Sequence, residues 1–437
     1  MGRVNVHTTR NVTATGFGNG GAARLPGLAV PVDLLARPDG FGGVRQGDLL
    51  CGTLVLEAGR AQRLDPDSGA KPPRGIVLPR LAEAHVHLDK CHSITRIADV
   101  GGDLAAALRA QRADKVHWTA GDLDHRTRRG MRELRSAGCG AVRSHVDWAT
   151  GPDAPEAPIA WDILGALAKA AAQDGIALQR AALTSIEDMA ETDRARQVAR
   201  RVARDGAVLG SFLFDQAQRH KGVLTLFRLA DRLGLPLDFH VDEGLDPALN
   251  GLEIIADVAL ETGFQGPVFC SHACSLASQQ ADTVARVAEK LAKASIALAV
   301  LPSTNLYLQG RRAGTPDRRG LTRLHELAAH GVNIVIGTDN VRDAFYPIGR
   351  HDPLHSLSLA VMAGHLDPPF GRHLRTITTT ARRAMGLAPL WIDDAASQDL
   401  IFFETPGLSD LIAGAARAVP LSEYQKGTPW LIMPRPL

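Results

Sequence analysis

The sequence predicts an α/β protein in which a (β/α)8 barrel of the TIM type carries a small β-sandwich built from both ends of the chain. The first observation is that the middle of the chain alternates apolar, β-rich runs with amphipathic helical segments, a pattern typical of parallel strands covered on both faces. The second is that the two ends carry short β-like pieces broken by Gly, Pro and Asp. A chain of 437 residues is long enough for both units.

The two ends of the chain are predicted to meet in one module. Residues 1–25 are rich in Gly, Asn and Thr and show little periodicity, as expected of a loose arm. β-Like pieces follow at Leu28–Val32 and Thr53–Leu56, and similar pieces return at Asp399–Phe403 and Trp430–Met433. We therefore expect three units: a loose N-terminal arm (1–25), a small β-sandwich (26–74 with 390–437) and the barrel (75–389).

Eight apolar runs supply the predicted barrel strands. Between them lie Ala- and Leu-rich stretches with the 3.6-residue spacing of a helix, for example Trp161–Ala172 and Ala281–Ala292. An open doubly wound sheet is the alternative, but the Gly-rich turn expected after its first strand is missing, so we prefer the closed barrel. The eight predicted strands are Ile76–Asp89, Ala141–Trp148, Ile176–Ser185, Val208–Phe214, Leu237–Glu243, Val268–Cys274, Ile296–Thr304 and Asn333–Asn340.

Charge and composition exclude several classes of function. The 49 basic and 47 acidic side chains leave a net charge of +2, so there is no electrostatic basis for binding nucleic acid or an anionic membrane. No run approaches the roughly 18 apolar residues of a membrane span, and the N-terminus lacks the apolar core of a secretory signal. The 5 cysteines are irregularly spaced, as is typical of a reducing compartment. We expect a soluble cytoplasmic protein whose oligomeric state, a homo-oligomer included, stays open.

Histidines and carboxylates stand at the carboxyl ends of several predicted strands, where a barrel places its active site. His85 and His87 lie two residues apart, so they project from one face of the first strand. His240 ends the fifth strand and Asp339 ends the eighth. These four residues are suited to hold one borderline divalent ion, Zn²⁺ or Fe²⁺, with an open position for water. Each alone has an ordinary explanation as a core histidine or a helix cap, but four such coincidences at one mouth are less plausible than one site.

Residues at the same mouth are assigned to proton transfer. A metal-activated hydroxide would attack the substrate, and Asp339 would accept the proton of the water. His272, at the end of the sixth strand, can hydrogen-bond this hydroxide or the developing oxyanion. Glu243 follows His240 by three residues, an odd offset that turns it away unless the strand has ended. We therefore expect Glu243 in a loop over the pocket, where it protonates a ring nitrogen.

Other polar residues adjoin the predicted site. Asp89 is expected to orient a ligand histidine, and Lys90 to be a structural or rim cation. His145 ends the second strand at the level of the site, and the sequence assigns it no role beyond support of the ligands.

At these residues the chain resembles the amidohydrolase superfamily and, within it, the cytosine deaminase branch. The resemblance covers roughly residues 76–405 and implies a mononuclear metal enzyme that hydrolyses a cyclic amidine and releases ammonia. It implies metal on His85, His87, His240 and Asp339, proton shuttling by Glu243 and positioning of the hydroxide by His272. The matching stretches are His85–Asp89, Arg143–Asp147, His240–Glu243, Ser271–His272 and Gly337–Asp339, supported by Asn305–Arg311, Arg318–Arg323 and Phe345–Pro347.

The residues that would recognise the substrate depart from those of the cytosine deaminases. Ser185 stands at the end of strand three, where that branch carries a glutamine that reads the pyrimidine edge, and a short hydroxyl cannot make a two-point amide contact. Asn340 follows Asp339, where a second acid is expected. Isocytosine, creatinine or an aminotriazine is therefore as plausible a substrate as cytosine. We expect Ser185, Gln309, Asn340 and Phe345 to bind it.

Three rival functions were weighed against this deaminase. A cyclic-amide hydrolase of the hydantoinase type resembles the first strand, but it bridges two metals with a carboxylated lysine at the end of strand four; here that strand ends at Ser211–Asp215, with no lysine before Lys221. The unrelated deaminases with Pro-Cys-x-x-Cys ligands are excluded, because Cys270 and Cys274 lie one residue too far apart. A metal-free binding or scaffold protein would lose neither metal nor activity when His240 is replaced.

Overall fold

The computed structural model describes residues 22–67, 72–98, 100–150 and 156–426. Its larger body is a ring of parallel strands in the order in which they follow along the chain. The ring closes just past its last strand, where the Asp339 N–H donates to the His85 carbonyl at 2.9 Å. The predicted (β/α)8 barrel is confirmed. Its strands are β6 (Leu81–Val86), β7 (Cys139–Asp147), β8 (Ala177–Ser185), β9 (Leu209–Leu213), β10 (Leu237–Val241), β11 (Val268–His272), β12 (Ala297–Val300) and β13 (Ile334–Ile336).

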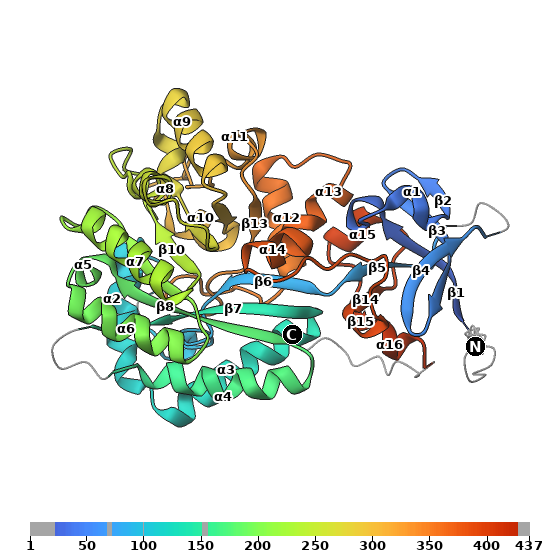
Figure 1. Ribbon diagram of the computed structural model, residues 1–437, viewed down its shortest axis with the longest axis horizontal. Coiled ribbons are helices and arrows are strands. Elements are labelled where there is room, and N and C mark those ends of the chain that lie inside the picture. The colour runs from blue at the N-terminus through green and yellow to red at the C-terminus, as the bar shows by residue number, and fades with distance from the viewer. Residues whose placement is uncertain (1–21, 68–71, 99, 151–155, 427–437) are drawn as a thin grey trace, which may run out of the picture.

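Helices cover the outside of this ring (Figure 1). Helix α3 shows why they form: Thr119 caps its first turn by accepting from the Asp122 N–H, and its buried residues recur every three or four positions against the strands. The α-helices are α1 (Pro38–Phe41), α2 (Leu104–Asp114), α3 (Ala120–Ser136), α4 (Ile159–Gln173), α5 (Ile186–Met189), α6 (Thr192–Arg204), α7 (Arg219–Leu233), α8 (Gly251–Thr262), α9 (Ala281–Lys293), α10 (Pro302–Leu308), α11 (Leu324–Ala329), α12 (Pro353–Gly364), α13 (Gly371–Leu374), α14 (Thr379–Ala384), α15 (Leu408–Ile412) and α16 (Leu421–Tyr424).

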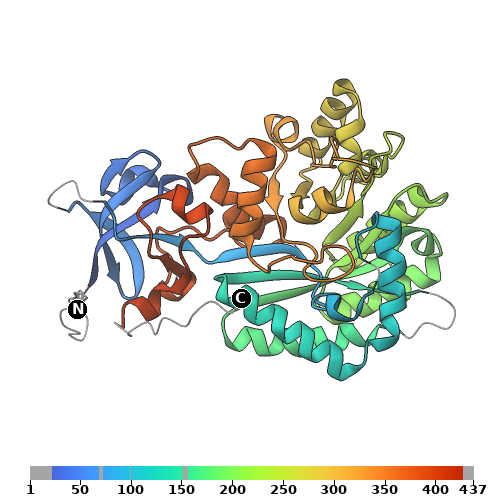
Figure 2. The ribbon, with the colours of Figure 1, turned by 180° about the vertical axis from the view of Figure 1, so that it is seen from behind.

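A separate seven-stranded sheet lies beside the barrel, as Figures 1 and 2 show from opposite sides. Its order is β15-β14-β5-β1-β3-β2, with β4 paired to β3, so strands from both ends of the chain pair in one sheet. Strand β5 lies parallel to β1 and antiparallel to β14. The strands are β1 (Ala23–Pro31), β2 (Val44–Gln46), β3 (Leu49–Glu57), β4 (Arg60–Asp65), β5 (Gly75–Pro79), β14 (Leu400–Phe403) and β15 (Ala418–Pro420).

Several predicted strands run past the strands of the structure, among them the eighth, because β13 ends at Ile336; two others show a physical reason. The first, Ile76–Asp89, is two strands: β5 pairs in the small sheet and ends at Pro79, the Arg80 N–H donates to the Asp399 carbonyl, and β6 then pairs in the barrel. The seventh, Ile296–Thr304, overran β12, because Pro302 starts helix α10. The β-like piece Trp430–Met433 and most of the predicted arm lie outside the described residues.

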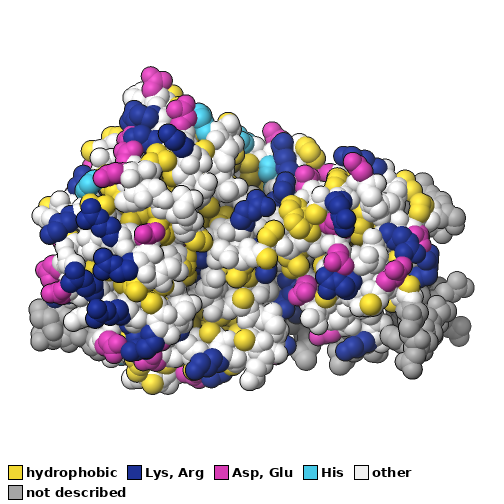
Figure 3. Space-filling view, in the orientation of Figure 1, with side chains coloured by type: hydrophobic (Ala, Val, Ile, Leu, Met, Phe, Trp, Pro, Cys, Tyr) yellow, Lys and Arg dark blue, Asp and Glu magenta, His cyan; other side chains and the backbone are white. Residues whose placement is uncertain are grey.

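The surface fits the even charge balance of the sequence. Lys and Arg side chains are interspersed with Asp and Glu over the face shown in Figure 3. Within the part of the chain that the structure describes, no helix has the length and apolar character needed to cross a bilayer.

Candidate active site

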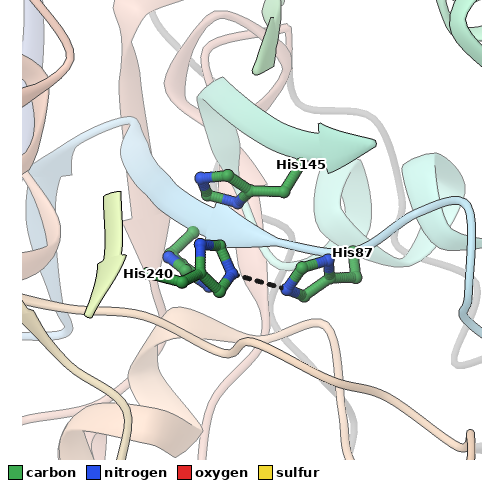
Figure 4. Close-up of side chains that lie close together, drawn as sticks. His87, His145 and His240 are labelled. Atoms are coloured by element: carbon green, nitrogen blue, oxygen red, sulfur yellow. Dashed lines mark hydrogen bonds between the residues drawn. The ribbon is translucent and has the colours of Figure 1, made fainter. Parts of the chain in front are cut away.

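The structure brings the predicted metal ligands together at the carboxyl ends of the barrel strands. His85 is the last residue but one of β6, His87 directly follows that strand, and His240 comes from β10. The Nε2 atoms of His87 and His240 lie 3.1 Å apart, and Figure 4 marks this contact with a dashed line. Asp339 Oδ1 lies 3.4 Å from Nε2 of His85 and 3.3 Å from Nε2 of His87. Residues from the first, fifth and eighth strands therefore meet at one point.

The buried atoms of this group fit a cation. Among the described residues, both ring nitrogens of His85, Nδ1 of His87 and of His240, and both carboxylate oxygens of Asp339 have no hydrogen-bond partner. The four side chains are buried, with at most 6% exposure, and buried polar atoms without partners are rare in proteins. A divalent ion accepts electron pairs from such nitrogens and oxygens, so the donor set fits one.

Burial keeps these groups in the protonation states that a metal needs. Burial, followed by the neighbouring imidazoles, lowers the pKa of His85 and His240 well below the ordinary histidine value. Burial likewise lowers the pKa of His87 to about 3. Burial alone would raise the pKa of Asp339, but the adjacent imidazoles of His85 and His87 hold it well below its usual range. The site therefore presents neutral imidazoles and an ionised carboxylate at neutral pH.

Glu243 and His272 stand side by side at the same mouth. Strand β10 ends at Val241, and Asp242 has a φ of +51°, so the chain leaves the strand before it reaches Glu243. Glu243 Oε1 lies 3.6 Å from His272 Nδ1, which also hydrogen-bonds Asn305 Oδ1 at 3.0 Å. Burial raises the pKa of Glu243 to about 7. The odd offset from His240 is thus compatible with a place in the pocket, because the strand period no longer applies.

His145 belongs to the cluster, a placement that its position along the chain did not settle. Its ring centre lies 4.1 Å from that of His85, and His85, His87, His145 and His240 each offer a nitrogen within 4.8 Å of the others. On its other side, His145 Nε2 lies 2.9 Å from Asp238 Oδ1, and Asp238 Oδ2 pairs with Arg143 at 2.9 Å. A carboxylate on the outer nitrogen orients an imidazole and its tautomer.

Two buried acids were missed by the sequence analysis. Asp238 precedes His240 by two residues on β10 and so shares its face. Glu83 precedes His85 by two residues, accepts from the backbone N–H of His85 at 3.1 Å and of Thr338 at 3.2 Å, and has its pKa raised to about 8 by burial. One sequence signal could have found both acids: each lies inside an otherwise apolar strand, two positions before a histidine of the site.

Asp89 and Lys90 both contact Asp147. Among the described residues no imidazole nitrogen lies within ion-pair distance of Asp89, so the expected role of orienting a ligand histidine is not seen; its Oδ2 accepts from the Asp147 N–H at 2.9 Å. Lys90 is buried, with Nζ 2.8 Å from Asp147 Oδ1 and 5.1 Å from the centre of the Phe345 ring. Burial opposes its charge, but Asp147 and Asp89 nevertheless raise the pKa of Lys90. Of the two roles expected for Lys90, a structural or a rim cation, its burial and its ion pair with Asp147 therefore favour the structural one.

The residues expected to bind substrate lie in three different settings. Gln309 donates to the Glu243 carbonyl at 3.2 Å, so it lies at the site. Asn340 donates to Asp343 Oδ2 at 2.7 Å, and the Phe345 N–H donates to Asp343 Oδ1 at 2.9 Å, so one buried acid holds both. Ser185 ends β8 and is half-buried; among the described residues it makes no hydrogen bond to the others.

Fold and site together define the class of protein. A (β/α)8 barrel with a second small sheet and histidines and an aspartate converging at the strand ends is the architecture expected of the amidohydrolases. Residues 96–400 match the model of the amidohydrolase family, and the chain therefore belongs to that family.

The most informative relatives carry out deaminations or related hydrolyses. A pterin deaminase from Rhizobium rhizogenes is 34% identical over 368 residues, which cover 84% of this chain and 81% of that protein. The crystal structure of 5-methylcytosine deaminase from Klebsiella pneumoniae with phosphonocytosine has a TM-score of 0.76 and 25% identity, with 95% of this chain and 98% of that chain covered. N-isopropylammelide isopropylaminohydrolase from Burkholderia multivorans shares the fold, with a TM-score of 0.66, 22% identity and coverage of 90% and 96%.

Proposed function

We propose that this protein is a metal-dependent hydrolytic deaminase that replaces the exocyclic amino group of a cyclic amidine by oxygen and releases ammonia. Its proposed substrate is an aminated bicyclic ring of the pterin type rather than cytosine. The substrate class rests on the 34% identity to a pterin deaminase over 84% of this chain. It is consistent with Ser185 at the position where cytosine deaminases carry a glutamine.

The observation that carries the chemistry is the set of buried, unpartnered donors beside Glu243. We propose that His85, His87, His240 and Asp339 hold one divalent ion, Zn²⁺ or Fe²⁺, with His145 supporting the ligands. The ion, when bound, supplies Lewis-acid activation of water, whose pKa falls to about 7. Two residues, Glu243 and His272, then remain free to handle protons and position the nucleophile.

The proton steps follow from the pairing of these residues. His272 Nδ1 faces Asn305 Oδ1 and so carries the ring proton, which leaves Nε2 as an acceptor for the attacking water. Asp339, ionised despite its burial, takes the proton that the water loses. Glu243, with a pKa of about 7, gives a proton to the ring nitrogen next to the attacked carbon. The proton held by Asp339 is then delivered to the amino group and the hydroxyl proton returns to Glu243, so ammonia leaves as the carbon–nitrogen bond breaks and the carbonyl forms.

The test is a panel of substrates with ammonia release as the readout. Protein reconstituted with zinc, iron or manganese is offered pterin, isocytosine, cytosine, guanine, creatinine and an aminotriazine. We expect the highest kcat/KM for pterin, with a matching change in its ultraviolet spectrum. Hydrolysis of a plain cyclic amide without turnover of any amidine would contradict the proposal.

A further inference from the structure

A second group of metal-ligating side chains lies outside the proposed active site. We call it the peripheral cluster; it consists of His92, Glu133 and His351. His92 follows β6 in a turn, Glu133 lies on α3, and His351 precedes α12. Glu133 Oε2 lies 2.9 Å from His351 Nδ1 and 3.5 Å from His92 Nε2, and one ligand atom of each residue lies within 4.8 Å of the others.

The imidazoles of the peripheral cluster have nitrogens that nothing satisfies. Both ring nitrogens of His92 and Nε2 of His351 lack a hydrogen-bond partner among the described residues. His92 is 8% and His351 is 2% exposed, so neither can rely on bulk water. The two imidazoles of His92 and His351 have four ring nitrogens. The hydrogen bond from His351 to Glu133 satisfies one of them, and the other three have no partner among the described residues.

The protonation states suit a cation. Burial lowers the pKa of His92 to about 3 and that of His351 below the ordinary value, so both rings are neutral. Burial alone would raise the pKa of Glu133, but the hydrogen bond with His351 lowers it to about 2. The two carboxylate oxygens of Glu133 have different partners. Oε1 lies 3.2 Å from Arg342 and 3.4 Å from Arg129, whereas Oε2 faces the imidazoles.

We propose that the peripheral cluster binds a second divalent ion, with zinc as the favoured metal. Two neutral imidazoles and one carboxylate are a set that zinc accepts, with water completing the coordination. That water has a route in, since Glu133 and His351 line a cavity of about 670 Å³. Arg129 and Arg342 offset the charge of Glu133, so we expect this site to bind zinc more weakly than the active site.

The position of the peripheral cluster assigns the ion a structural role. His92 lies five residues after His87, and His351 lies twelve residues after Asp339. The His92 N–H already donates to the Val341 carbonyl at 3.1 Å, so the two segments run side by side. An ion on all three ligands would tie both segments to α3. The inference does not depend on the proposed deaminase activity.

The experiment measures zinc stoichiometry and affinity in the full chain. We expect wild-type protein to bind two ions in two steps, and Asp339→Asn to retain the weaker step. His92→Asn keeps the left-handed backbone of His92, whose φ is +60°, because Asn tolerates that conformation. We expect His92→Asn and His351→Gln to weaken the second step on the order of tenfold or more. His355→Gln, on helix α12 shortly after His351 but outside the cluster, should leave both steps unchanged.

A spectroscopic readout separates this result from a change in activity. Cobalt replaces zinc, and the visible spectrum of the second equivalent should disappear in His92→Asn and in Glu133→Gln, while the first equivalent stays. Glu133 is partly exposed, so Glu133→Gln keeps the test valid if the histidine variants do not fold. A single binding step in wild-type protein that Asp339→Asn abolishes, or an unchanged weaker step in Glu133→Gln, would overturn the proposal.

Discussion

The buried pair of Arg143 and Asp238 allows a prediction whose size follows from the structure. The two side chains are 1% or less exposed and meet at 2.9 Å. In Asp238→Asn, the guanidinium keeps its hydrogen bonds to Gln179 and to the Met385 carbonyl but loses its counter-charge. Removing one partner of a buried ion pair costs about 3–5 kcal/mol, because the other charge stays buried and uncompensated. That loss is a large part of the roughly 5–15 kcal/mol that stabilises a typical fold.

Urea unfolding of the metal-free protein measures this loss. The matched control is Asp124→Asn, which breaks the exposed pair of Asp124 with Arg128 on α3 and should cost about 0.5 kcal/mol or less. In Arg143→Met with Asp238→Asn, no charge is left uncompensated, so we expect a smaller loss than the sum of the two single variants. A loss below about 1 kcal/mol in Asp238→Asn, or strict additivity, would refute the reasoning.

The same contacts predict a direction with pH. The pKa of Asp238 is lowered in the folded protein, since burial, which opposes its charge, is outweighed by His145 and Arg143. The stabilisation is therefore present above the ordinary aspartate pKa and is lost as the pH falls through the lowered value. We expect wild-type protein to lose stability over that range and Asp238→Asn to lose less of it.

Three further predictions concern the site and the scaffold. Glu243→Gln should lower kcat by about 10²–10⁴ with metal content unchanged, and wild-type kcat/KM should fall as the pH rises past about 7, because Glu243 acts as an acid; equal loss of metal would contradict that role. His240→Ala should lose both bound metal and activity, as measured by elemental analysis and ammonia release, and an active, fully loaded variant would refute its place among the ligands. Thr119→Ala should destabilise α3 by about 1 kcal/mol in thermal unfolding, with Thr119→Ser close to wild type, since the Thr119 hydroxyl accepts from the Asp122 N–H.

The alternation of apolar runs with helical stretches was enough to predict the barrel. Each strand of a parallel sheet is buried on both faces, so its sequence is an almost continuous apolar run. The strand ends likewise placed His85, His87, His240 and Asp339 at one mouth, since the carboxyl ends of parallel strands share one edge. These inferences need only local patterns and one topological rule.

Only the tertiary structure decided which side chains meet across strands. The partnership of His145 with Asp238, the turn of Asp89 away from the imidazoles and the nearness of His92 to His351 depend on spacing between segments far apart in the chain. The division of the first predicted strand between two sheets has the same origin, because β5 finds its partners in β1 and β14. The periodicity of a segment predicts which face of a strand or helix a residue occupies. Its neighbours on that face come from other segments, so they are decided only when the segments pack together.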